Sequence, residues 1–266
     1  MKPHPRVRCL TLFLLPLCLP ALHGQSTAAD YLDRANTKAA KGDPAGAIAD
    51  YDRAIALDPS QSEAFYDRGA AKEAKGDHNG AVADYDEAVR LNPKFPKAFN
   101  NRGLAKGAKD DPEGAIADFD HAIALDPNYA IAFYNRGRAK KTMGDLDGAI
   151  ADYDHAIALK SDFTLAYINR GVAKSAQDQP DAAISDYDRA IALDPKFAPA
   201  FYNRGVAKEA KGNLAGAIDD LNQAVAIDPG YVSAYKKLAT AQRKQGNEPA
   251  AKAAEAMVAK LTGKGK

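Results

Sequence analysis

The chain has 266 residues, and its 36 lysines and arginines against 35 aspartates and glutamates leave a formal net charge of +1 at pH 7. This near-neutral balance argues against a nucleic-acid partner recognised through a strong basic field. Two cysteines and no tryptophan leave little scope for a disulfide framework, while 46% hydrophobic and 27% charged residues indicate a folded chain.

The first 26 residues have the pattern of a secretory signal peptide. Three basic residues and no acidic residue stand at the start: Lys2, Arg6 and Arg8. The apolar run that follows, residues 9–19, is shorter than the roughly 20 residues that a membrane-spanning helix needs. We expect cleavage near Ala21 or Gly24, which predicts a secreted or periplasmic protein with no stable membrane span. The alternatives are an uncleaved leader that anchors the protein to a membrane, or a cytosolic protein.

From residue 28 onward, the sequence repeats every 34 residues. A glycine keeps this step at Gly69, Gly103, Gly137, Gly171 and Gly205. An alanine keeps it at Ala47, Ala81, Ala115, Ala149, Ala183 and Ala217. An aromatic residue keeps it at Tyr51, Tyr85, Phe119, Tyr153 and Tyr187, with Leu221 in sixth place. A proline keeps it at Pro59, Pro93, Pro127, Pro195 and Pro229, with Ser161 once in its place. Seven units fit, at 28–61, 62–95, 96–129, 130–163, 164–197, 198–231 and 232–265.

Each unit is predicted to form two helices joined by a tight turn. In the second unit, the helices are expected over about residues 62–75 and 79–91, with the turn at Gly76 and Asp77. Only glycine or aspartate occupies the turn position, which indicates a left-handed backbone there. Its seven members are Gly42, Gly76, Asp110, Gly144, Asp178, Gly212 and Gly246. The periodic glycine of the first helix and alanine of the second let the two helices approach closely.

This 34-residue pattern of small residues, an aromatic and a proline resembles the tetratricopeptide repeat (TPR) family. The resemblance covers residues 27–266, the whole chain after the leader. It implies an all-α fold, a right-handed superhelical solenoid of seven helix-turn-helix units. It also implies a non-catalytic scaffold or adaptor that holds a protein or peptide partner in a concave groove. A self-associating structural protein, and hence a homo-oligomer, is one alternative, and an accessory subunit of an enzyme complex is another.

Two charged series follow the same period. Arginines stand at Arg34, Arg68, Arg102, Arg136, Arg170 and Arg204, and aspartates at Asp50, Asp84, Asp118, Asp152, Asp186 and Asp220. In the seventh unit both series end together, at Leu238 and Ala254. We predict a row of exposed ion pairs, each contributing roughly 0–1 kcal/mol. The alternative is that the arginines and the aspartates lie on two separate faces of the solenoid and are solvated independently.

A series of amides is the strongest candidate for a binding site, because the first helix of each unit is expected to line the groove. The series is Asp33, Asp67, Asn101, Asn135, Asn169, Asn203 and Lys237. An asparagine offers a carbonyl acceptor and an amide donor, so it can pair with the backbone of an extended peptide. The series resembles the asparagine ladder of the TPR superhelix in O-linked N-acetylglucosamine transferase and, in part, the carboxylate-clamp TPRs. The alternative is a purely structural role for these asparagines.

The residue before each member of this series adds tyrosines, which offer a flat apolar contact with a polar tip: Tyr66, Tyr134 and Tyr202. Only the last residue at that position, Lys236, is basic, so the match to a carboxylate clamp is partial. Acidic residues at the first end of the series and Lys237 at the other predict that the basic part of a partner lies near the N-terminal units.

Catalytic and metal-binding motifs are not found after the leader. His121 and His155 stand one repeat apart without a third ligand, and we expect a solvated pair. The recurring Asp-x-Asp motif, as in Asp50 and Asp52, cannot converge on one ion because residues i and i+2 of a helix point apart. We therefore predict no enzyme activity, no cofactor and no metal. Lys252 and Glu255 in the last helix predict a polar cap for the solenoid.

Overall fold

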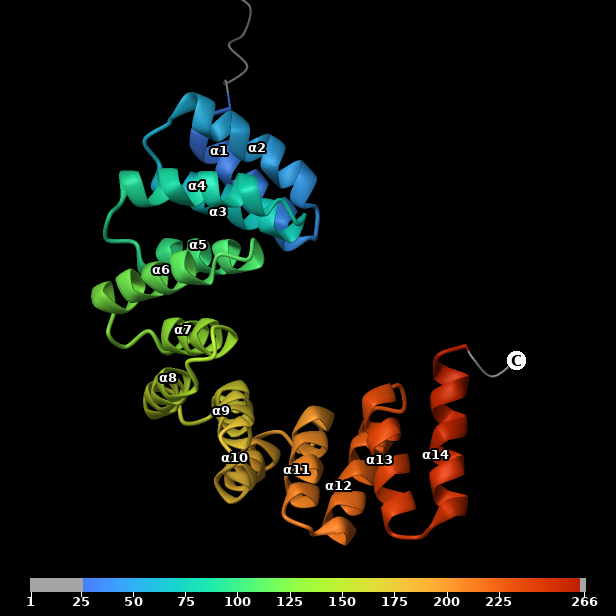
Figure 1. Cartoon of the computed structure of the whole chain (residues 1–266). Helices are drawn as coiled ribbons and strands as arrows, with labels where there is room; N and C mark the ends of the chain where they lie inside the picture. The colour runs from blue at the N-terminus through green and yellow to red at the C-terminus, as the bar shows by residue number, and fades with distance from the viewer. Residues whose placement is uncertain (1–25, 264–266) are drawn as a thin grey trace, which may run out of the picture.

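The computed structural model describes residues 26–263, so the predicted leader lies, except for its last residue, outside the described part of the chain (Figure 1). The described residues form helices α1 (Ala28–Ala40), α2 (Pro44–Leu57), α3 (Ser62–Ala74), α4 (His78–Leu91), α5 (Pro96–Ala108), α6 (Pro112–Leu125), α7 (Ala130–Thr142), α8 (Leu146–Leu159), α9 (Thr164–Ala176), α10 (Pro180–Leu193), α11 (Ala198–Ala210), α12 (Leu214–Ile227), α13 (Val232–Lys244) and α14 (Glu248–Leu261).

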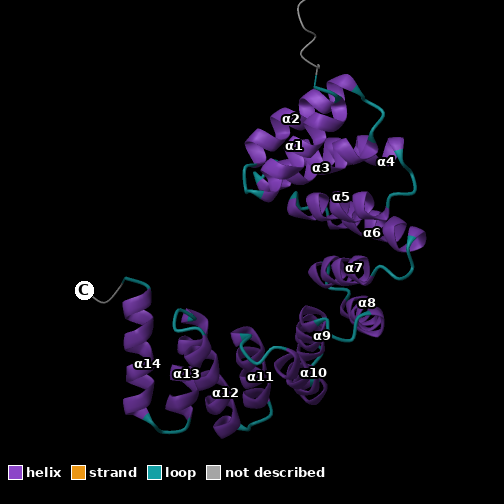
Figure 2. Ribbon diagram, turned by 180° about the vertical axis from the view of Figure 1, so that it is seen from behind, coloured by secondary structure: helices purple, strands orange, loops and turns teal. Residues whose placement is uncertain are grey.

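These helices form pairs that stack in chain order, and one pair lies within each 34-residue unit. We call the odd-numbered members A helices and the even-numbered members B helices. Successive A helices contact one another across unit boundaries, whereas no two B helices do so within residues 26–263. The chain therefore curves with its A helices on the inside, and Figures 1 and 2 show the resulting open arc from α1 to α14. The prediction of an all-α fold of paired helices is confirmed.

The start of each B helix is set by a side-chain cap in most units. In the second unit, α4 begins at His78, one residue earlier than predicted, because Asp77 accepts a hydrogen bond from the Gly80 N–H at 2.9 Å. A Cβ atom on Gly80 would lie 2.2 Å from the Asp77 carboxylate. The glycine three residues after the cap therefore leaves room for the capping side chain.

The turn between the helices of each unit has the left-handed backbone that the sequence predicts. The glycines at this position have φ between +76° and +85°, and Asp110 and Asp178 have φ of +62° and +59°. A residue with a Cβ atom is strained in this region by roughly 1–2 kcal/mol, although aspartate tolerates it better than most.

This strain predicts that Asp178→Gly stabilises the protein. We expect the free energy of unfolding to rise by about 1 kcal/mol, because glycine adopts the left-handed region without strain. Thermal melts followed by circular dichroism measure the effect. The reverse change at an equivalent turn, Gly212→Asp, is the control and should lower the midpoint. A lower midpoint for Asp178→Gly would contradict the account.

Small residues bring the two helices of a unit together. A Cβ atom on Gly137 would lie 2.8 Å from Cε1 of Tyr153 and 3.1 Å from the Ala149 carbonyl oxygen. Tyr153 and Ala149 are fully buried. The predicted close approach of the periodic glycine and alanine is confirmed, and the aromatic ring packs directly on the glycine. The buried residues form separate clusters along the arc, and the cluster around Tyr153 spans neighbouring units.

Candidate functional site

The periodic arginines and aspartates form ion pairs in every unit from the first to the sixth. In the fourth unit, Arg136 donates to Asp152 from Nε at 2.9 Å and from Nη2 at 2.6 Å. Lys140, one helical turn further along α7, contacts the same carboxylate at 2.9 Å. The predicted row of pairs is confirmed in its geometry, but its predicted exposure is wrong. The Asp152 side chain is only 2% exposed, because the two cations and the packed helices cover it.

Each arginine from the second to the sixth unit also reaches back to the preceding unit. Arg136 donates through Nη1 to Asp120 at 2.6 Å, and Asp120 is the second aspartate of the Asp-x-Asp motif on α6. The motif therefore holds two successive arginines, one inside its unit and one from the next. The guanidinium fork suits this arrangement because it offers donors on two edges.

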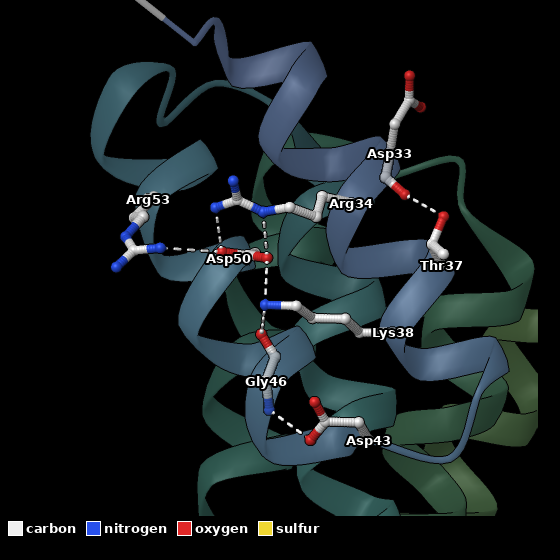
Figure 3. A network of polar contacts seen from close by, with 8 residues as sticks. All are labelled: Asp33, Arg34, Thr37, Lys38, Asp43, Gly46, Asp50 and Arg53. Carbon is white, nitrogen blue, oxygen red and sulfur yellow. Dashed lines mark hydrogen bonds and ion pairs between the residues drawn. The ribbon is translucent and has the colours of Figure 1, made fainter.

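Figure 3 shows the first unit, which has no preceding helix pair within residues 26–263. Here Arg53 takes part instead, at 3.1 Å from Asp50, while Arg34 and Lys38 approach the same carboxylate at 2.6 and 2.7 Å. The hydrogen bonds from Arg34 exceed the effect of desolvation and hold the pKa of Asp50 well below its ordinary value. The folded protein therefore stabilises the charged form of this aspartate.

The network ends at the seventh unit, where all its members change together. Leu238, Gln242 and Ala254 stand where the earlier units have arginine, lysine and aspartate. Asn222 likewise replaces the second aspartate of the motif in the sixth unit. The lysine series was not singled out from the sequence, although its 34-residue step was visible: Lys38, Lys72, Lys106, Lys140, Lys174 and Lys208.

The asparagine series lies along the A helices, and three of its members bind the preceding A helix. The side-chain amide of Asn101 donates to the Tyr66 hydroxyl at 3.0 Å, and that of Asn169 donates to the Tyr134 hydroxyl at 3.1 Å. The Asn135 amide donates to Oδ1 of Asn100 at 2.9 Å. These asparagines therefore join successive units, a structural role of the kind that the alternative interpretation of the series allows.

Asn203 differs from the other three asparagines. The residue it would reach on the preceding A helix is Ile168, which offers no side-chain acceptor. No hydrogen bond joins the Asn203 side chain to another residue within 26–263, and the side chain is half-buried. Its donors and acceptor stay available on the groove wall.

This difference predicts unequal effects on stability. We expect Asn169→Ala to lower the free energy of unfolding by about 1–2 kcal/mol, because it removes bonds to the Tyr134 hydroxyl, the Leu165 carbonyl and the Lys141 ammonium. We expect Asn203→Ala to cost less than about 0.5 kcal/mol. Urea titrations measure both variants. Equal losses would show that the hydrogen bonds do not contribute to folding.

The predicted tyrosines lie at unit junctions, where their rings pack on other aromatic rings. The centroid of Tyr66 is 4.9 Å from that of Phe95, the centroid of Tyr134 is 4.8 Å from that of Phe163, and that of Tyr202 is 5.2 Å from Tyr231. Tyr134 is only 9% exposed. A partner can therefore reach little of the Tyr134 ring, while Tyr66 and Tyr202 are half-buried.

The two ends of the series are charged as the sequence shows, but only one end has its charge paired. Lys237 lies 2.7 Å and Lys244 lies 2.6 Å from Glu209 on the preceding A helix. Burial alone would raise the pKa of Glu209, but the two lysines outweigh it and lower the pKa. At the other end, burial and then the nearby Glu63 raise the pKa of Asp67, which has no ion-pair partner within residues 26–263.

His121 and His155 pack against phenylalanines of their own units in a tilted arrangement. The His121 ring lies 5.2 Å from Phe99 and the His155 ring lies 5.1 Å from Phe133. No group of three or more histidine, cysteine, aspartate or glutamate side chains within residues 26–263 is arranged to hold a metal ion. Over the same range, no helix combines the length and apolar character needed to cross a membrane.

Models of the tetratricopeptide repeat match the sequence at residues 32–96, 130–163 and 168–232, and a TPR repeat model matches residues 108–144. The range 130–163 is the fourth unit, 32–96 and 168–232 each cover most of two units, and 108–144 spans α6 and α7 across a unit boundary. The chain is a tetratricopeptide repeat protein. TPR proteins generally mediate protein–protein interactions, and the curved row of A helices is the part of this TPR protein that offers a continuous surface.

Solved TPR structures share the fold of this chain. The crystal structure of MamA is 27% identical, with a TM-score of 0.57 over 60% of this chain and 94% of MamA. YrrB, a TPR protein with an unusual peptide-binding site, is 23% identical, with a TM-score of 0.58 over 69% of this chain and 95% of YrrB. PilW, a type IV pilus biogenesis factor, is 22% identical, with a TM-score of 0.69 over 77% of this chain and 94% of PilW. No curated protein matches the sequence.

Proposed function

We propose that this TPR protein is a non-catalytic adaptor that holds an extended segment of a protein partner against its A helices. The leader-like first residues support a role outside the cytoplasm, in the periplasm or as a secreted protein. The peptide-binding site named for YrrB supports a peptide as the ligand of this fold, although that similarity is one of fold. Asn101, Asn135, Asn169 and Asn203, with Asp67, Lys237 and the rims of Tyr66, Tyr134 and Tyr202, are the proposed contacts.

The observation that carries this proposal is a run of exposed apolar side chains in the middle of the groove. Ile131 and Leu165 are 47% and 44% exposed. Each stands four residues before an asparagine of the series, Asn135 or Asn169, and therefore lies on the same helix face. Leu104, on the preceding A helix, is 39% exposed. Apolar contacts beside amide groups suit a peptide that is bound through both its side chains and its backbone.

A photo-crosslinking amino acid placed at Ile131 tests this proposal in cells of the source organism. We expect mass spectrometry to find a crosslink to a segment of another protein. The same amino acid at Leu159, which is 41% exposed at the end of a B helix, is the control and should yield little of that product. Equal capture at both positions, or none at Ile131, would reject the groove as the binding site.

The same experiment separates the two alternatives. Crosslinks between two copies of this chain, together with a dimer or larger species in light scattering, would support a self-associating structural protein. Capture of one stable enzyme subunit over a folded surface, and not over an extended segment, would support an accessory subunit.

A further inference from the structure

Two hollows open between neighbouring A helices, and they have opposite charge. The first, of about 380 Å³, lies between α1 and α3, and Asp67 is the one charged residue that lines it. The second, of about 390 Å³, lies between α5 and α7 and is lined by both Arg138 and Lys141. Asp110, in the turn after α5, also lines the second hollow but forms no ion pair with either cation within residues 26–263.

Both hollows exist because one position of the repeat is occupied by a very small residue. That position holds Ala39, Glu73, Gly107, Lys141, Ser175, Glu209 and Arg243. Its side chain can reach forward to the next A helix: Lys141 donates to Asn169 at 2.9 Å, and Glu209 contacts Lys237 at 2.7 Å. Ala39 lines the first hollow and Gly107 lines the second, and neither can reach across the gap.

The junction between the sixth and seventh units shows what such a gap accepts. There the Glu209 carboxylate lies between Lys237 and Lys244, and its side chain is only 9% exposed. At the junction of the third and fourth units, Gly107 stands in place of Glu209, and Asn135 and Thr142 stand in place of the two lysines. The cations that line this gap come from two other positions of α7, Arg138 and Lys141. A carboxylate from outside the chain can take the vacant place.

Within residues 26–263, Asp67, Arg138 and Lys141 form no ion pair, although Lys141 donates to the Asn169 side chain. Arg138 forms no ion pair within the described chain and lies 5.8 Å from the centroid of the Tyr134 ring. Burial and then the charge of Arg138 lower the pKa of Lys141, while burial and then Glu63 raise the pKa of Asp67. Both shifts disfavour the charged forms, and a bound counter-charge would reverse both.

From this arrangement we infer the charge pattern of the partner segment, an inference that rests on the proposed function. The segment carries a basic side chain that enters the α1–α3 hollow beside Asp67, and an acidic side chain that enters the α5–α7 hollow beside Arg138. The hollows are two units apart. With helices packed about 10 Å apart, this is roughly 20 Å, or about six residues of extended chain.

A first test needs no partner, because a side chain of the protein itself can fill each hollow. Gly107→Glu should melt about 2–4 °C above Gly107→Lys, and Ala39→Lys should melt above Ala39→Glu by a similar amount. The same pair at Ser175, near the end of α9, supplies the baseline, because the helix dipole alone favours lysine there. Gly107 tolerates a side chain, since a Cβ atom added there would contact only the Ala115 Cβ, at 3.8 Å. If the order of melting temperature between the glutamate and lysine variants is the same at residues 39, 107 and 175, the charge assignment is wrong.

A second test uses blocked, fluorescein-labelled ten-residue peptides, measured by fluorescence anisotropy on the full chain. The first peptide has leucine and alanine throughout, except for one lysine and one glutamate six residues apart. We expect replacement of its glutamate by glutamine to weaken binding at least tenfold, and Gly107→Glu to weaken binding of the original peptide similarly. The control Ser175→Glu, which leaves the α5–α7 hollow open, should change binding less than twofold.

Three results would overturn the inference. These are equal affinity for the charged and glutamine peptides, failure of the charged peptide to bind, and tighter binding of a peptide whose only carboxylate is its free C-terminus. None of these three results decides the proposed function, which is tested separately by crosslinking at Ile131. Crosslinking at Ile131 that Gly107→Glu leaves unchanged would keep the groove as a binding site while rejecting the charge pattern. Absence of crosslinking at Ile131 would reject the groove itself.

Discussion

Asp152→Ala is expected to lower the free energy of unfolding by about 3–5 kcal/mol, because it removes one partner from a buried ion pair. The substitution leaves Nε and Nη2 of Arg136 and the ammonium of Lys140 without their common acceptor. The Arg136 side chain is only 18% exposed, so water cannot fully replace the lost carboxylate. Urea denaturation followed by circular dichroism in the far ultraviolet measures the loss.

The seventh unit supplies the matched control for this prediction. The triple variant Arg136→Leu, Lys140→Gln and Asp152→Ala copies the residues that the chain itself uses at Leu238, Gln242 and Ala254. We expect the triple variant to be more stable than Asp152→Ala alone, since it leaves no cation without its partner and replaces the pair by apolar packing. Asp120, which also loses Arg136, is 54% exposed and keeps its hydration. If the losses from the three changes simply add, the network is not a unit and the account fails.

The period of the sequence predicts the arginine–aspartate pairs of this network but not its lysines or its burial. A charged residue on an amphipathic helix is normally exposed, and that general expectation led to a row of weak surface pairs. The aspartate lies on a B helix. It is buried because an arginine and a lysine of the packed A helix of the same unit both contact its carboxylate. Two of these groups, the arginine and the aspartate, were visible as periodic series. The third, the lysine, stands four residues after the arginine and follows the same 34-residue step, but only the fold shows that it reaches the aspartate.

The groove was harder to predict, because its shape depends on what is missing at two positions. The asparagine series is visible in the sequence, but whether an amide faces a partner or the preceding helix depends on the residue 35 positions earlier. Tyr66 and Tyr134 accept a hydrogen bond, and Ile168 does not. The hollows likewise depend on the short side chains at Ala39 and Gly107, whose meaning becomes clear only when the other units show how far that position reaches.

Gly137→Leu is expected to have the second large effect, a loss of about 2–3 kcal/mol from overpacking. Already the first added atom would meet the Tyr153 ring at 2.8 Å and the Ala149 carbonyl oxygen at 3.1 Å. The ring is fully buried and the carbonyl belongs to helix α8, so neither can move without separating α7 from α8. The better helix propensity of leucine, worth about 1 kcal/mol over glycine, offsets only part of this cost.

Gly107→Leu is the control that isolates the contact from the residue type. It makes the same substitution in an A helix, but a Cβ atom added at this position would meet only the Ala115 Cβ, at 3.8 Å. Here the gain in helix propensity should act alone, and we expect a small rise in the thermal midpoint. The thermal midpoint of Gly137→Ala should fall between those of the two leucine variants. The first unit places Ala35 at the equivalent position, where it is fully buried in the same cluster as Tyr51.

Equal midpoints for Gly137→Leu and Gly107→Leu would mean that the glycine is not kept for the close approach of the two helices. A low midpoint for Gly137→Leu alone would show that the aromatic ring, resting on a residue without a side chain, sets the spacing within each unit.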